Sequence, residues 1–162
     1  MPVNLFTDAS LKGSETRGCY IITKNNQNKG FKSSTNYNQI KMFRTPIVEV
    51  DTKINKPTIC DMEFKTIIEA LVHAIKLHPE EKFFTVYSDS LPAIARIDKP
   101  WYEIQQNGME PMLLKLHDYI ASTNRVIKIK IKHVKAHKDN LAGNPEKFNF
   151  MCDIFASVVN KI

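Results

Sequence analysis

Four carboxylates lie beside apolar segments, and they constrain the fold of this chain more than any other feature. Asp8 follows the apolar run 3–6, and Asp89 ends a second apolar run in FFTVYSD. Glu63 lies near the start of an amphipathic segment, and Asp153 interrupts the apolar sequence NFMCDIFAS. An unpaired carboxylate is costly to bury. A fold that gathers these four groups is therefore expected to hold divalent cations, which would neutralise them.

The hydrophobic pattern predicts one α/β domain, residues 1–162, with elements in the order βββαβααβα. Strands are expected near residues 3–8, 19–23, 41–50, 83–89 and 126–134. Helices are expected near residues 59–77, 91–97, 109–122 and 146–161. No internal repeat or linker divides the chain. The prediction is a five-stranded mixed sheet with helices packed on it.

This order of elements also predicts where the acids meet. The first and fourth strands are expected to lie side by side and parallel, because a helix connects them. Asp8 and Asp89 would then lie at the carboxyl ends of adjacent strands, where open α/β sheets build their sites. The helix of Glu63 packs over this sheet, and the last helix can bring Asp153 to the same rim. Two Mg²⁺ ions about 4 Å apart would neutralise such a cluster and clamp a phosphoryl group.

Composition narrows the partners and the compartment. The net charge of +6 and the pI near 9.2 favour a polyanionic partner. Three scattered cysteines favour a reducing, intracellular location, which we expect to be the cytoplasm. The N-terminal sequence does not resemble a signal peptide, and no apolar run is long enough to span a bilayer. No phosphate-loop or serine-nucleophile motif is present, and we expect no organic cofactor.

Several of these residues also have simpler interpretations. Asp89 and Ser90 could cap the following helix, and Glu63 could complement its helix dipole. The lysines of 128–132 alternate with isoleucines, which suits either a protected edge strand or a surface for nucleic acid. The spacing of His133 and His137 is a poor match to a zinc site, because a strand end does not present both to one ion.

Five motifs occur in the order found in the type 1 ribonuclease H family. They are TDAS at 7–10, MExxxxxxAL at 62–71, YSDS at 87–90, VKAH at 134–137 and NxxxD at 149–153. The chain therefore resembles this family over nearly its whole length, and the resemblance implies a ribonuclease H-like fold. TDAS resembles the version found in retroelements. This resemblance suits a domain fused to, or acting beside, a reverse transcriptase or polymerase, and the alternative of a free enzyme stays open.

The resemblance implies a metal-dependent endoribonuclease that cleaves the RNA strand of RNA/DNA hybrids and leaves 5′-phosphate and 3′-hydroxyl ends. Asp8, Glu63, Asp89 and Asp153 match the acids that bind two Mg²⁺ ions, with Mn²⁺ as a substitute. His137 matches a histidine that assists proton transfer or product release. The residues expected to contact nucleic acid are Ser10, Thr58, Ser90, Lys135, Lys138 and Asn149.

Two alternatives remain at the level of sequence. One is a nuclease of the same fold that acts on DNA, similar to a resolvase or an integrase. The other is a non-catalytic ribonuclease H-like module that only binds nucleic acid. Ile59, Cys60 and Leu91 differ from residues frequent in the family, and the segment 138–148 is longer than usual. These departures leave open how strictly the protein discriminates hybrids from other duplexes.

Overall fold

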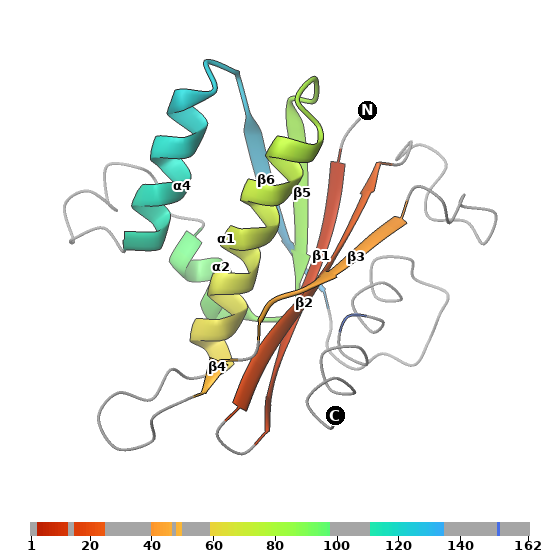
Figure 1. Ribbon diagram of the computed structural model, residues 1–162, viewed down its shortest axis with the longest axis vertical. Coiled ribbons are helices and arrows are strands. Elements are labelled where there is room, and N and C mark those ends of the chain that lie inside the picture. The colour runs from red at the N-terminus through yellow and green to blue at the C-terminus, as the bar shows by residue number, and fades with distance from the viewer. Residues whose placement is uncertain are drawn as a thin grey trace.

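The computed structural model describes residues 3–12, 15–24, 40–46, 48–49, 59–97, 111–134 and 152. In this part of the chain, a mixed β-sheet carries its helices against one face (Figure 1). None of the helices described is both long and apolar enough to cross a membrane.

The sheet has five main strands in the order β3-β2-β1-β5-β6, and the two-residue β4 also pairs with β2. β1 pairs antiparallel with β2 and parallel with β5, and β6 runs parallel to β5 at the far edge. This confirms the predicted five-stranded mixed sheet and the parallel contact between the first and fourth predicted strands. The strands are β1 Val3–Lys12, β2 Glu15–Lys24, β3 Ile40–Arg44, β4 Val48–Glu49, β5 Phe83–Ser88 and β6 Lys128–His133.

Three described helices form the layer over one face of the sheet: α1 Ile59–Leu77, α2 Leu91–Ile97 and α4 Pro111–Ser122. The predicted apolar face of α1 is buried in the main core, because its spacing keeps one side of the helix on the sheet. β6 also follows its sequence pattern. Its isoleucines pack on this core, while Lys128, Lys130 and Lys132 are exposed along the edge strand. The core residues of α1 are Phe64, Ile67, Ile68, Ala70, Leu71, Ala74 and Ile75.

The strands near the N-terminus differ from the prediction in length. β1 continues past residue 8 to Lys12, and β2 begins at Glu15, so the two form one long antiparallel ladder. The predicted third strand, 41–50, is divided into β3 and β4. The division lies at Thr45 and Pro46, where proline has no N–H for the ladder.

Thr45 holds the chain to β2 at this break. Its N–H donates to the carbonyl oxygen of Gly18, and its Oγ1 accepts a hydrogen bond of 2.8 Å from the N–H of Gly18. Nε of Arg17 donates to the Thr45 carbonyl oxygen at 2.7 Å. These bonds replace the strand pairing that ends at Arg44 and satisfy both the N–H and the carbonyl oxygen of Thr45.

A second, smaller core lies on the other face of the sheet. The rings of Phe6 and Tyr87 stack there with centroids 5.0 Å apart, next to the buried side chains of Cys19 and Cys152. Cys152 is helical, as predicted for the last segment. The rest of the predicted helix 146–161 lies outside the described residues. Cys152 itself lies against Phe6 of β1.

Arg125 joins the end of α1 to the segment before β6. Its guanidinium donates three hydrogen bonds of 2.8 Å each, to the carbonyl oxygens of Ile75, His78 and Glu81. Carbonyls at the end of a helix lack partners within the helix, and a charged donor is a strong partner for them. We expect Arg125→Ala to lower the free energy of unfolding by about 2 kcal/mol, measured by urea denaturation.

Arg125→Lys is the matched variant for this prediction. Lysine keeps the positive charge but cannot present the planar fork that reaches three carbonyls, so most of the loss should remain. Equal unfolding midpoints for wild type and Arg125→Ala would show that these bonds contribute nothing net.

Candidate active site

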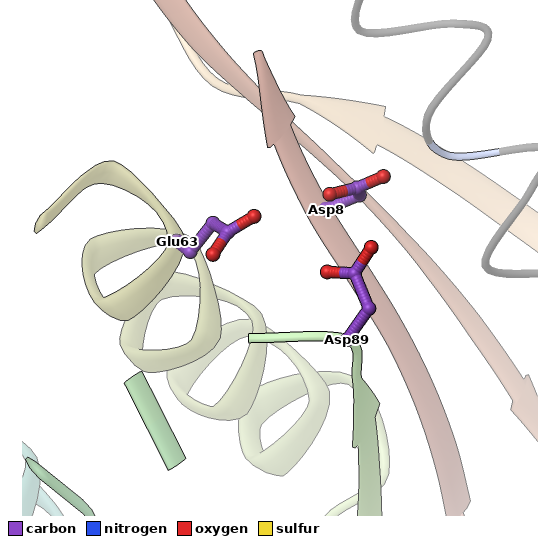
Figure 2. Close-up of side chains that lie close together, drawn as sticks. All are labelled: Asp8, Glu63 and Asp89. Carbon is purple, nitrogen blue, oxygen red and sulfur yellow. The ribbon is translucent and has the colours of Figure 1, made fainter. Parts of the chain in front are cut away.

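Three of the four predicted acids converge on one point. Asp8 comes from β1, Glu63 from the start of α1, and Asp89 from the bend after β5. One carboxylate oxygen from each residue lies within 4.8 Å of the others. Figure 2 shows the three side chains pointing toward one another across the space between the helix and the two strands. The prediction that these three residues meet is therefore confirmed.

The sheet explains the convergence of the two aspartates. The described pairing between β1 and β5 ends at Phe6 and Tyr87, and each aspartate follows two residues later in its own strand or bend. Beyond this point β1 continues along β2, whereas the chain after β5 turns into α2. Neighbouring parallel strands thus separate where both present a carboxylate, the position at which open α/β sheets place their sites.

Burial distinguishes the three acids. Asp8 is only 4% exposed, whereas Glu63 and Asp89 are partly exposed. The N–H of Ala9 donates a hydrogen bond of 2.9 Å to Oδ1 of Asp8, which helps to fix that carboxylate. The cluster therefore has a buried acid on its inner side and two more accessible acids.

Ser90 provides a side-chain cap of α2. Its Oγ accepts a hydrogen bond of 3.2 Å from the N–H of Ala93 in the first turn of that helix, as an N-cap residue does. Its own N–H donates to Oγ of Ser88 at 3.1 Å. Ser90 thus has a structural role whether or not it contacts nucleic acid, and Asp89 points into the acid cluster.

Cys152, the residue before the fourth acid, lies close to the site. Its Sγ donates a hydrogen bond of 3.2 Å to the carbonyl oxygen of Phe6. Burial raises the pKa of the Cys152 thiol, and the neighbouring Cys19 and Asp8 raise this pKa further. Since Phe6 precedes Asp8 by two residues in β1, the hydrogen bond to Phe6 places Cys152 near the acid cluster. Asp153 follows it in the sequence but lies outside the described residues.

Of the other predicted site residues, only Ser10 is also described. It is half-buried in the extended part of β1, and its carbonyl oxygen accepts a hydrogen bond of 2.8 Å from Oγ1 of Thr16. The remaining predictions lie outside the described residues: Thr58, Lys135, His137, Lys138 and Asn149.

The sequence alone did not reveal the contact that places α1 on the sheet. Gly18 of β2 faces Thr66 of α1, and a Cβ atom added at position 18 would lie 2.9 Å from Cβ of Thr66 and also overlap its Oγ1 and Cγ2. Oγ1 of Thr66 donates a hydrogen bond of 2.7 Å to the carbonyl oxygen of Met62, the residue before Glu63. The missing side chain at Gly18 therefore lets the start of α1 approach the strands that carry the site. A glycine inside a strand is the signal for such an approach.

The donor set suits a hard divalent cation. Each of the three acids offers a carboxylate oxygen, the ligand type that Mg²⁺ and Mn²⁺ prefer. Like charges this close repel one another, and a bound cation would relieve the repulsion. The described residues therefore fit a divalent-metal site.

A protein-family model for RNase H matches residues 1–160. The N-terminal RNase H domain of a Mycobacterium tuberculosis protein is 15% identical, with a TM-score of 0.55 and 98% of each chain covered. The RNase H domain of prototype foamy virus is 15% identical, with a TM-score of 0.64, and the match covers 96% of this chain and 92% of that domain.

Prototype foamy virus protease-reverse transcriptase is 14% identical, with a TM-score of 0.58, and the match covers 99% of this chain but only 21% of the viral protein. At these identities the structures show a shared fold. The search of curated proteins found no significant match. The family match spans nearly the whole chain and agrees with the sheet order and the acid cluster, so the chain belongs to the RNase H family of nucleases.

Proposed function

We propose that this protein hydrolyses the RNA strand of RNA/DNA hybrids with the help of divalent cations, and leaves 5′-phosphate and 3′-hydroxyl ends. The observation that carries the proposal is the meeting of Asp8, Glu63 and Asp89 within 4.8 Å at the point where β1 and β5 separate. Membership of the RNase H family supports the reaction class. The three acids also lie in the motifs TDAS, MExxxxxxAL and YSDS, through which the sequence resembles that family.

Asp8, Glu63, Asp89 and Asp153 would hold the cations, with two Mg²⁺ ions as the proposed occupants and Mn²⁺ as a substitute. Bound divalent cations would lower the pKa of water and neutralise charge on the reacting phosphodiester. The position of Cys152 against Phe6 supports a role for Asp153, because Cys152 directly precedes Asp153 in the sequence and Phe6 precedes Asp8 by two residues.

The protein's own residues would orient the substrate and handle protons. Asp8, fixed by the N–H of Ala9, would form the rigid inner side of the site, while Glu63 and Asp89 would face the incoming phosphate. His137 is proposed to move a proton or assist product release, since an ordinary histidine titrates near neutral pH. Lys135 and Lys138 would pair with backbone phosphates, which supply most of the affinity for nucleic acid.

A reverse transcriptase is the proposed neighbour of this domain. The similarity to about a fifth of prototype foamy virus protease-reverse transcriptase supports this proposal, as does the TDAS sequence at 7–10. Either arrangement, fusion or association, would place the domain where hybrids are made.

The decisive experiment compares four labelled substrates of one sequence: RNA/DNA hybrid, duplex RNA, duplex DNA and single-stranded RNA. We expect Mg²⁺-dependent cleavage of the RNA strand of the hybrid, and at least about a hundredfold slower cleavage of the others. A protein that selects hybrids must sense the RNA 2′-hydroxyl on one strand and its absence on the other. End analysis should find 5′-phosphates, and EDTA should stop the reaction.

Other outcomes of this comparison would replace the proposal. Faster cleavage of duplex DNA would identify a DNA nuclease of the same fold. Hybrid binding without cleavage, together with no heat of Mg²⁺ binding in calorimetry, would identify a non-catalytic module.

A further inference from the structure

A concave site that shares no described residue with the acid cluster lies over α1 and α4. Its volume is about 730 Å³, and its apolar floor consists of Ile68 and Val72 from α1 with Met112 and Leu116 from α4. The two floor residues of each helix are four apart, so they follow one side of that helix. Sites of this size accommodate organic ligands or peptide side chains. None of its described lining residues belongs to the acid cluster.

The polar border of this site, which we call the α1/α4 groove, is mainly basic. Lys65, Lys76 and Lys115 line it together with one acid, Glu69, so these four residues carry three positive charges against one negative charge. Nζ of Lys76 lies 5.2 Å from the centre of the Tyr119 ring, and Nζ of Lys65 lies 3.9 Å from Oε1 of Glu69. The border therefore favours an anionic partner, and the floor favours an apolar one.

Tyr20 and His73 form a polar wall of the groove, and their own contacts hold it in place. The hydroxyl of Tyr20 and Nδ1 of His73 share a hydrogen bond of 2.7 Å, and the ring of Phe43 packs against both side chains. Burial raises the pKa of Tyr20 to about 12, so this hydroxyl stays neutral and available as a hydrogen-bonding group at physiological pH. A wall held by its own contacts is organised before a ligand arrives, which reduces the entropy cost of binding.

The spacing of the lysines indicates the size of the partner. Lys65 and Lys76 are eleven residues apart on one helix, which corresponds to roughly 16 Å along its axis, about three turns. A partner that contacts both lysines and the apolar floor must span that length. An amphipathic helix with acidic residues beside its apolar face has this length and pattern, and binds grooves between helices in other proteins.

We propose that the α1/α4 groove binds an acidic amphipathic helix of a partner protein. Apolar side chains of the partner would cover Ile68, Val72, Met112 and Leu116, while its carboxylates would pair with Lys65, Lys76 and Lys115. The site is separate from the proposed metal cluster, so it would tether the nuclease to a partner without blocking hydrolysis.

The test uses three fluorescein-labelled 14-residue helical peptides and fluorescence anisotropy with the full chain. The first peptide has leucines on one face flanked by glutamates, the second replaces each glutamate with lysine, and the third shuffles the first so that its leucines surround the helix. We expect the first peptide to bind saturably and at least about tenfold more tightly than the other two, because only it matches both charge and apolar face.

Charge reversal in the groove makes the test specific. Lys76→Glu with Lys115→Glu should weaken binding of the acidic peptide by about tenfold or more and strengthen binding of the lysine peptide. The matched control, Lys128→Glu with Lys132→Glu, changes the same charge on exposed residues of β6 and should leave the preference for the acidic amphipathic peptide over the other two unchanged. Lys115→Glu alone, at an exposed position, serves if the double variant does not fold.

Measuring hybrid cleavage by the groove variants tests peptide binding independently of the proposed nuclease activity. The groove variants should keep wild-type cleavage rates, since none of their residues belongs to the acid cluster. Equal binding of all three peptides, no saturation, or equal effects of the groove and β6 variants would overturn the proposal. A small organic anion that competes with the acidic peptide while no peptide selectivity is seen would also overturn it, and would identify a ligand pocket instead.

Discussion

Asp8→Asn is expected to reduce Mg²⁺-dependent cleavage of an RNA/DNA hybrid by roughly a thousandfold or more, which is about 4 kcal/mol of transition-state stabilisation. Asp8 is the most buried of the three clustered acids, and its Oδ1 is fixed by the N–H of Ala9. Asparagine keeps the shape of the side chain but loses the charge that holds a cation. Single-turnover cleavage of a labelled hybrid measures the effect.

Although it should greatly reduce cleavage, the same substitution should not destabilise the fold when metal is removed. Three carboxylate oxygens within 4.8 Å repel one another, and removing one charge relieves between about 1 and 3 kcal/mol of this repulsion. In EDTA, Asp8→Asn should therefore melt at or above the wild-type temperature. Added Mg²⁺ should raise the melting temperature of the wild type more than that of the variant, because binding stabilises only a competent site.

Asp118→Asn is the control, because Asp118 is an exposed residue of α4 whose side chain is 69% accessible. It should leave cleavage, stability and the response to Mg²⁺ unchanged. Cleavage by Asp8→Asn within about threefold of wild type would exclude Asp8 as a metal ligand. A lower melting temperature of Asp8→Asn in EDTA would show that the buried carboxylate stabilises the fold through its hydrogen bonds more than it destabilises it by repulsion.

Local patterns predicted the elements well where one face of an element is buried. The spacing of apolar residues placed α1 at 59–77, and the alternation of isoleucine and lysine identified β6 as a strand with one exposed face. Such periodicities reflect burial directly. The convergence of Asp8, Glu63 and Asp89 was also predicted, because parallel strands joined through a helix place their carboxyl ends at one edge.

Features that depend on contacts between distant segments were not predicted. The predicted second strand, 19–23, leaves out Gly18, but Gly18 lies inside β2 and faces Thr66. The predicted strand 41–50 does not include the break after Arg44, because the bonds from Thr45 to β2 join residues that are far apart in the sequence. The α1/α4 groove was not foreseen either, since it is formed by helices whose relative position no local pattern encodes.

Gly18→Ala is expected to destabilise the protein by about 3 kcal/mol, the upper end of the usual cost of overpacking. The new methyl group would overlap the side chain of Thr66, which is fully buried and cannot move into solvent. The strand and the helix must therefore separate. Urea denaturation measures the loss, and an unchanged midpoint would mean that α1 moves away from β2 at little cost.

Separation of α1 from β2 should also impair the site, because Thr66 lies one turn after Glu63 on the same helix. A displacement of roughly 1 Å can cost on the order of a hundredfold in rate, so hybrid cleavage should fall even where the variant is fully folded. Weaker Mg²⁺ binding in calorimetry should accompany the loss. Normal Mg²⁺ binding and cleavage by the folded variant would show that the Gly18–Thr66 contact supports stability alone.

A double-mutant cycle distinguishes this contact from a general weakening of β2. Thr66→Gly removes the three atoms nearest to the new methyl group, at the expense of about 1 kcal/mol of helix propensity and the hydrogen bond to Met62. If the overlap causes the damage, the two substitutions together should cost about 2 kcal/mol less than their separate effects predict, and cleavage should recover in part. Additive effects would instead assign the damage to the strand itself. Glu63 lies on the same helix as Thr66, whereas Asp8 lies on β1, which pairs with the strand of Gly18. Recovery of Mg²⁺ binding in the double variant would therefore show that the close approach at Gly18 sets the spacing between these two acids.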